Sequence, residues 1–251
     1  MMTDYYHKAD TLAFQYQILS TSKEMLFRVN ELIDASRMQL SLFDYAVQTQ
    51  SSINQADSKV VSYRFSSILA LLQTFRDALV QALKDVNVSS ISDNVPHAVL
   101  FQQLRNALVH DGYQPIALWV DGRYYLPASF IRYNQSGKAI RIEAPALDVE
   151  TLALQYSEGY CKRLAEFIES LPTDKKLRGP QRTYEWFQAA WKHPVLQKFK
   201  DLEMPTRDNW PQYPENEPAP LDLAAKELRY ISNLCKARLE ELAKLPDVPF
   251  K

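Results

Sequence analysis

The sequence predicts a mainly α-helical protein: a helical bundle with a small antiparallel β-hairpin insertion and a C-terminal helical extension. Three observations support this fold class. The 251 residues include only five glycines, and none precedes Gly112. Apolar residues recur at helical spacing on both sides of the segment at about 116–143. That segment carries short β-type runs separated by turn residues instead. Because glycine destabilises helix interiors, a long stretch without it favours long helices.

The first two helices are predicted from apolar stripes with a polar break between them. Thr3 can cap the first helix, and a T-x-x-E capping box at 21–24 is expected to restart or bend it. The polar segment 49–58 ends this helix. A second stripe, over 60–83, defines the next one.

A third helix and two hairpins follow. Pro96 suits the first turn of the third helix, and Gly112 is expected to end it. Asp121-Gly122 is a strong hairpin turn signal between two short apolar runs. A second hairpin is predicted over 130–143.

The last part of the chain divides into a helix and an extension. Asp148 can cap a helix that runs to about Ser170, so we expect a bundle domain at 1–170 with the hairpins inserted at about 116–143. Residues 171–251 form the C-terminal extension: a basic and aromatic segment, a proline-rich acidic linker and a terminal amphipathic helix. The sequence leaves open whether this extension is a separate lobe or packs on the bundle.

The charge balance and the absence of several motifs exclude some classes of function. Lys+Arg 29 against Asp+Glu 30 excludes a protein that coats nucleic acid through bulk charge. No phosphate-binding glycine motif, HExxH or GxSxG occurs, so a metal or serine hydrolase has almost no support, and no cofactor is expected.

Cys161 and Cys235 lie far apart and favour a reducing compartment. Without a signal-peptide pattern or a long apolar run, we expect a cytoplasmic protein that does not enter a membrane.

Arg105, Asn106 and His110 gather within six residues at the end of the predicted third helix. A titratable imidazole beside a guanidinium suits RNA cleavage, because one group moves a proton and the other neutralises the pentavalent phosphate. The 2′-hydroxyl of the RNA supplies the nucleophile, so this chemistry needs no metal. From the residues alone, the alternative is that Arg105 forms a salt bridge with a neighbouring helix and His110 caps the helix end.

Arg105-Asn106, followed after three residues by His110 late in the third helix of a bundle, resembles the HEPN family. That family is marked by an arginine, four to six residues and a histidine, with a polar residue directly after the arginine. The resemblance covers roughly residues 1–170. It implies a metal-independent endoribonuclease that leaves 2′,3′-cyclic phosphate ends and dimerises so that two motifs face one RNA cleft. Arg105 would contact the scissile phosphate, His110 would act as general acid or base, and Asn106 would orient them.

The resemblance also implies a biological setting. Many HEPN proteins are toxins in toxin–antitoxin or abortive-infection defence systems, so a cognate antitoxin or nucleotidyltransferase is an expected partner. Toxins paired with a nucleotidyltransferase often have a tyrosine two residues after the histidine. Here Tyr113 is three residues after it, which leaves the subfamily open.

Further RNA contacts are expected outside the motif. Lysines and arginines track phosphates, and exposed aromatic rings stack on unpaired bases. The candidates are Lys175, Lys176, Arg178, Arg182 and Tyr113. The alternative for the basic segment is that its tryptophans are core residues and its lysines a solvated face. Arg132 and Arg141, on facing strands of the second hairpin, are expected to be exposed, and the alternative is that they line an RNA groove.

Two function classes therefore stand: the ribonuclease, and a non-catalytic HEPN-like module that binds a nucleotide, RNA or a protein. Geometry separates them. A nuclease needs Arg105 and His110 accessible in one cleft, whereas an Arg105 buried in a carboxylate pair favours the binding module.

Overall fold

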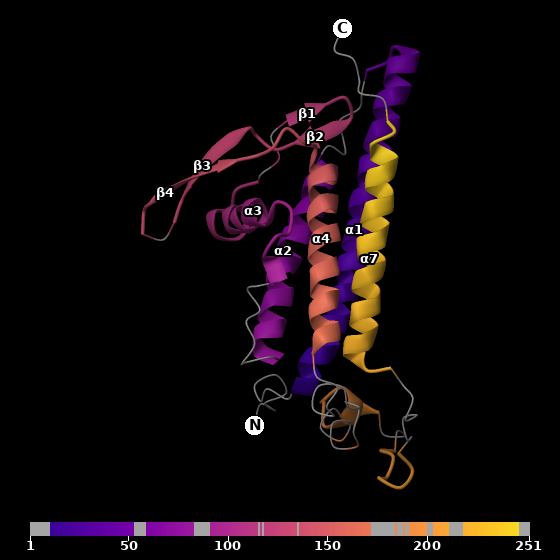
Figure 1. The fold of residues 1–251 in the computed structure, drawn as a ribbon. Coiled ribbons are helices and arrows are strands. Elements are labelled where there is room, and N and C mark those ends of the chain that lie inside the picture. Colours follow the sequence, from indigo (N-terminus) through magenta and orange to yellow (C-terminus); the bar gives the residue numbers. More distant parts are fainter. Residues whose placement is uncertain are drawn as a thin grey trace.

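The computed structural model describes residues 11–52, 59–82, 91–114, 116, 118–134, 136–171, 184, 188, 191–199, 203–210 and 218–245. It is mainly helical with two small antiparallel hairpins (Figure 1), which confirms the predicted class at this level. The helices are α1 (Thr11–Thr49), α2 (Lys59–Ala82), α3 (Ala98–Asp111), α4 (Val149–Ser170) and α7 (Pro220–Leu242). The strands are β1 (Leu118–Val120), β2 (Arg123–Tyr125), β3 (Ser129–Tyr133) and β4 (Ala139–Glu143).

Helix α1 runs through the capping-box sequence without interruption, so the expected restart at 21–24 is wrong. The Thr21 hydroxyl donates to the Gln17 carbonyl (2.8 Å), four residues earlier, rather than capping a new helix. Ile18 and Met25, on either side, are both buried, and this burial favours a continuous helix. Thr3 lies outside the described residues.

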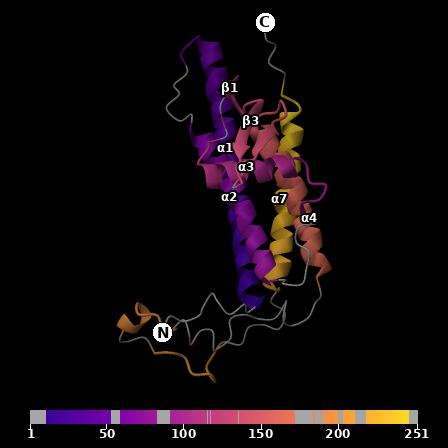
Figure 2. The same ribbon diagram turned by 90° about the vertical axis from the view of Figure 1, so that its left-hand side faces the viewer.

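The four long helices α1, α2, α4 and α7 lie alongside one another and enclose the core (Figures 1 and 2). Helix α7 packs mainly against α4 and α1, and its residues Leu228, Ile231 and Cys235 are fully buried. The terminal helix is therefore part of the bundle, which answers the question the sequence left open. Cys161 of α4 and Cys235 are both buried and free.

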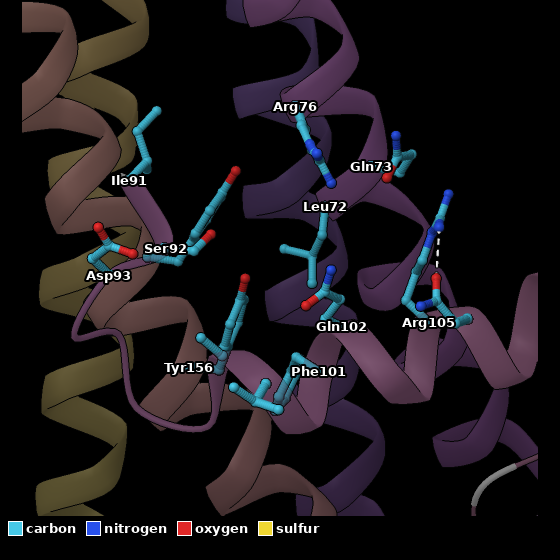
Figure 3. A pocket seen from close by; sticks show the side chains of 14 residues that line it. Leu72, Gln73, Arg76, Ile91, Ser92, Asp93, Phe101, Gln102, Arg105 and Tyr156 are labelled. Atoms are coloured by element: carbon cyan, nitrogen blue, oxygen red, sulfur yellow. Dashed lines mark hydrogen bonds between the residues drawn. The ribbon is translucent and has the colours of Figure 1, made fainter. Parts of the chain in front are cut away.

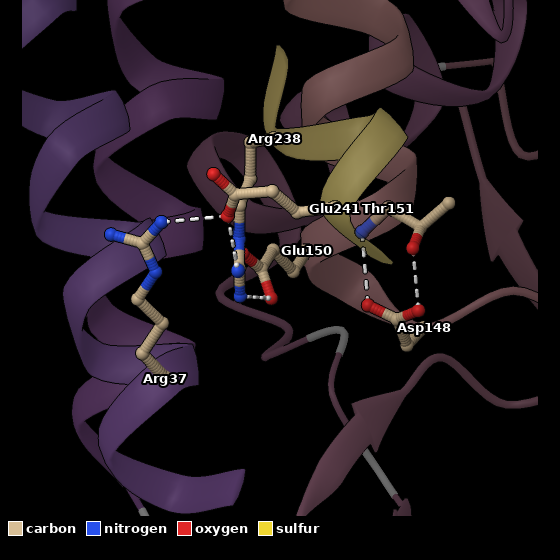
Figure 4. Close-up of polar contacts among 6 residues, drawn as sticks. All are labelled: Arg37, Asp148, Glu150, Thr151, Arg238 and Glu241. Atoms are coloured by element: carbon tan, nitrogen blue, oxygen red, sulfur yellow. Dashed lines mark hydrogen bonds and ion pairs between the residues drawn. The ribbon is translucent and has the colours of Figure 1, made fainter. Parts of the chain in front are cut away.

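A buried ion pair joins α7 to the start of α4 (Figure 4). Arg238 donates from Nε to Oε1 of Glu150 (2.8 Å) and from Nη1 to the exposed Glu241 (2.9 Å). Arg37 of α1 donates to the same Glu241 carboxylate (2.8 Å). The predicted cap of α4 is confirmed, since Asp148 accepts from the Thr151 backbone N–H at 2.9 Å.

Helix α3 runs across the long helices rather than along them (Figures 1 and 2). It ends where predicted, at Gly112, whose φ of 66° lies in the left-handed region. The β1–β2 turn at Asp121-Gly122 has positive φ at both residues (52° and 76°), as a type I′ turn requires. The hairpins thus lie at the end of α3, beside one end of the bundle.

The described part of the basic, aromatic segment includes the 3₁₀ turn η2 (Leu196–Lys198). It lies beyond the ends of α4 and α7, at the opposite end of the bundle from the hairpins (Figures 1 and 2). Within the described residues, no helix combines the length and apolar character needed to cross a membrane.

Candidate active site

The last two turns of α3 have one buried apolar face and a second face that carries the polar side chains of the motif. Leu104 and Ala107 are buried under the helix. Arg105 and Asn106 are half-buried, and His110 is exposed. The Tyr113 N–H donates to the Ala107 carbonyl (3.1 Å), which closes the helix end just after the histidine.

The three motif side chains contact one another. Arg105 Nη1 donates to Asn106 Oδ1 at 2.8 Å and lies 3.4 Å from His110 Nε2. An arginine has no acceptor and stays protonated, so this contact requires that Nε2 of His110 be the acceptor, without a proton. Asn106 fixes one side of the guanidinium, and the imidazole presents a basic nitrogen next to it.

Arg105 is not neutralised by a carboxylate. Across the described part of the chain it makes no ion pair, and its buried Nε atom has no hydrogen-bond partner. Among the described residues Arg105 is therefore not held in a carboxylate pair, and His110 is exposed but is not one of the residues that line a cavity beside Arg105. Such a cluster can bind a phosphate and move a proton beside it.

A second arginine ties the β3–β4 hairpin to the end of α3. Arg132 Nε donates to Asp111 Oδ2 (2.8 Å) and Nη1 donates to Gln103 Oε1 (3.2 Å). Its side chain is only 10% exposed, so the expectation of a solvent-exposed Arg132 is wrong, whereas Arg141 is exposed beside Glu143. The Arg132 guanidinium lowers the pKa of Asp111 below its ordinary value.

No sequence pattern predicts this Arg132–Asp111 pair. The one available signal was the acid directly after the motif histidine. Its partner is 21 residues away, and only the hairpin brings it close.

Of the other predicted RNA contacts, one lies beside the motif and the remaining four are outside the described residues. Tyr113 lies next to the motif and stacks on Phe130 (centroids 5.3 Å apart), with 39% of the residue exposed. Lys175, Lys176, Arg178 and Arg182 lie outside the described residues. The described part of their segment lies away from α3 (Figure 2).

A cavity of about 420 Å³ opens beside Arg105 and Asn106, between α2, α3 and α4 (Figure 3). Arg76 contributes a second guanidinium to its lining, and Asp93 is the one carboxylate among the lining residues. Sequence reasoning missed Arg76 because an arginine on an exposed helix position carries no signal of its own.

Aromatic residues line the deep side of this cavity. Phe101 stacks on Tyr156 (4.1 Å between centroids), which stacks on Tyr160 (5.5 Å). Burial raises the pKa of both tyrosine hydroxyls, so they stay protonated and can donate hydrogen bonds. Neither hydroxyl is bonded to a described residue.

The remaining histidines have local roles or are not described. His97 Nε2 pairs with Gln155 Oε1 (2.7 Å), and His193 Nδ1 accepts from the Val195 N–H (3.2 Å). His7 lies outside the described residues. In the described ranges, no three His, Cys, Asp or Glu side chains gather as metal ligands would.

Comparison with models of known protein families, with curated proteins and with solved structures finds no match to this chain.

Proposed function

We propose that this protein is a metal-independent endoribonuclease of the HEPN type, with Arg105, Asn106 and His110 as its catalytic residues. The observation that carries the proposal is the contact between Arg105 and His110 (3.4 Å), at a helix end where His110 is exposed and no carboxylate of the described residues pairs with Arg105. The resemblance supplies the roles of the three side chains, and the mutual contacts of Arg105 with Asn106 and His110 support those roles.

The reaction uses the RNA's own 2′-hydroxyl. As the Arg105 guanidinium turns from His110 to the phosphate, Nε2 of His110 removes the proton from that hydroxyl, whose oxygen attacks the adjacent phosphorus. Arg105 neutralises the charge that develops on the phosphorane oxygens. The P–O5′ bond breaks, the leaving oxygen takes up a proton, and the products are a 2′,3′-cyclic phosphate and a 5′-hydroxyl.

A dimer supplies the second proton-transfer group. One imidazole cannot hold a proton and be free of it at once, so a second His110, from another copy, can protonate the leaving oxygen. Val99 (73% exposed) and Val109 (51% exposed) lie on α3 before and after Arg105, and a second copy placed against this helix would cover them. We therefore propose a homodimer with both motifs at one RNA cleft.

The proposal extends to the biological role of the protein in the cell. A ribonuclease of this type acts in the cytoplasm as a toxin or abortive-infection effector, restrained by a cognate antitoxin or a nucleotidyltransferase. Induced expression should then stop growth with the native chain and not with the His110→Ala variant, as measured by colony counts.

The direct test is cleavage of total RNA and transfer RNA in EDTA by the purified protein. We expect His110→Ala and Arg105→Ala to lower the cleavage rate by roughly 100-fold or more, the usual size of a general acid–base contribution. Arg141→Ala, which removes an exposed arginine of the β3–β4 hairpin, is the matched control and should cleave normally.

Equal activity in the wild type and both motif variants would refute the mechanism. A folded wild-type protein that binds RNA without cleaving it would identify the non-catalytic binding module instead. Cyclic phosphate ends, detected by their resistance to ligation until the phosphate is removed, would establish the 2′-hydroxyl as nucleophile.

A further inference from the structure

The charged and polar residues that line the cavity beside Arg105 suit an anionic ligand that carries hydroxyl groups. Arg76 and Arg105 bring two positive charges to its wall, against the one carboxylate, Asp93, that the described residues contribute. Within the described chain, Arg76 forms neither an ion pair nor a hydrogen bond, although it is exposed at the cavity (Figure 3). Unpaired guanidinium groups that converge on one cavity suit a phosphate, which accepts paired N–H bonds from each.

The remaining polar groups suit the nucleoside attached to such a phosphate. Gln102 presents a side-chain amide, which holds both donors and an acceptor and can read a base edge. Gln73 already donates to Asp77, and Asn106 Oδ1 already accepts from Arg105. Tyr156 and Tyr160 are each only 4% exposed, yet their hydroxyls are left without a bond to a described residue. Both residues line the cavity, so a ligand there can accept a hydrogen bond from either hydroxyl.

The cavity size fits one nucleotide. Its volume of about 420 Å³ is within the range of roughly 300–1,000 Å³ typical of small-ligand sites. The aromatic rings of Phe101, Tyr156 and Tyr160 are stacked on one another, so the ligand is recognised through hydrogen bonds rather than by stacking on these faces.

Arg105 connects this cavity to the catalytic motif. Its guanidinium contacts His110 on one side and contributes to the cavity wall on the other. We propose that the cavity binds the nucleotide adjoining the scissile phosphate of single-stranded RNA, with Arg76 as a phosphate ligand. This inference rests on the proposed ribonuclease function and names a substrate-binding residue that the motif does not include.

The test measures RNA binding with cleavage removed. In the His110→Ala protein, fluorescence anisotropy with a short labelled single-stranded oligoribonucleotide gives the dissociation constant. Adding Arg76→Ala should weaken binding by about tenfold, as expected for losing a charge-assisted hydrogen bond. Adding Arg163→Ala, which removes an exposed arginine of α4, is the control and should change binding little.

A second variant tests the cavity without removing a side chain. Gln102 is exposed in the lining, so Gln102→Glu keeps its shape and adds a negative charge. We expect this change to weaken RNA binding at least as much as Arg76→Ala, and more strongly at low salt. If Arg76→Ala and Gln102→Glu both bind RNA as tightly as the Arg163→Ala control, the inference is overturned.

Competition separates the two sources of the ligand. A nucleoside 5′-monophosphate should displace the oligoribonucleotide in an Arg76-dependent way, whereas inorganic phosphate at the same concentration should displace less. If the mononucleotide binds through Arg76 but leaves the RNA bound, the cavity is a site for free nucleotides and the RNA assignment is wrong.

The outcomes also separate this inference from the proposed function. Wild-type cleavage together with unchanged binding by Arg76→Ala would overturn the cavity assignment and leave the ribonuclease standing. Arg76-dependent RNA binding by a wild-type protein that does not cleave would support the nucleotide site and refute the ribonuclease.

Discussion

The buried ion pair between Arg238 and Glu150 gives a quantitative test of how α7 completes the bundle. Both residues are less than 10% exposed, and they are bonded Nε to Oε1 at 2.8 Å and Nη2 to Oε2 at 3.4 Å. Arg238→Met keeps an unbranched apolar stem of similar size but leaves the Glu150 carboxylate buried without its guanidinium. Removing one partner of a buried pair typically costs about 3–5 kcal/mol of unfolding free energy.

Removing both charges should restore most of that loss. The double variant Glu150→Leu/Arg238→Met replaces the pair by apolar side chains, a change that is often neutral or stabilising, so we expect it within about 1 kcal/mol of wild type. Arg229→Met is the matched control, because Arg229 pairs with Glu169 across the same two helices but at exposed positions. Its effect should be a small fraction of that at Arg238.

The loss should also depend on pH. Burial already raises the pKa of Glu150, and without Arg238 only the weaker effect of the Arg37 charge still lowers it. A carboxyl whose folded-state pKa exceeds its unfolded value favours the protonated native state. The Arg238→Met penalty is therefore complete above the folded pKa and shrinks as the pH falls toward the unfolded value of about 4.3. The double variant lacks the carboxyl, so its difference from wild type should not follow this trend.

Urea unfolding followed by circular dichroism at pH 7 and pH 5 measures these free energies. A loss below about 1 kcal/mol for Arg238→Met at pH 7 would mean that the pair is hydrated and that α7 does not close the core as described. A double variant as unstable as the single one would show that the cost is lost packing rather than an uncompensated charge.

Three further predictions follow from the fold. Gly122→Ala should destabilise the protein by roughly 1–3 kcal/mol in urea unfolding, since its φ is +76° and a Cβ would lie 2.9 Å from that of Phe43; an unchanged midpoint would contradict the close approach to α1. Burial raises the pKa of Cys235 to about 12 and that of Cys161 well above its ordinary value, so both thiols should resist iodoacetamide at pH 8 until the protein is denatured. Rapid labelling of the native protein would argue against the α4–α7 core. Arg132→Ala should raise the pKa of Asp111 toward its ordinary value in an NMR titration, because that guanidinium is what lowers it, and an unmoved pKa would show that the pair does not form in solution.

The helices could be predicted because each carries its own local signals. The amphipathic pattern of α2, the Asp148 cap of α4 and the Gly112 end of α3 depend on neighbours a few residues away. The restart at Thr21 was predicted wrongly for the same reason. A capping box is a local signal, and the tertiary burial of α1 on both sides of it favours one continuous helix.

The candidate site could be predicted only in part. Arg105, Asn106 and His110 lie within six residues on one helix, so their proximity follows from helix geometry alone. Arg132, Arg76 and Asp93 reach the end of α3 and its adjoining cavity from β3, from α2 and from the segment before α3. None has a local pattern that distinguishes it from other surface charges.

The sequence alone determined the helices, the hairpin turns and the motif, because local periodicity, caps and turn residues act over a few positions. The tertiary structure decided three things: α7 belongs to the bundle, no carboxylate of the described residues pairs with Arg105, and a cavity with a second arginine adjoins the motif. Each of these depends on which surfaces pack together across the chain. The apolar stripe of a helix predicts that this face is buried, but it does not identify the element that packs against it.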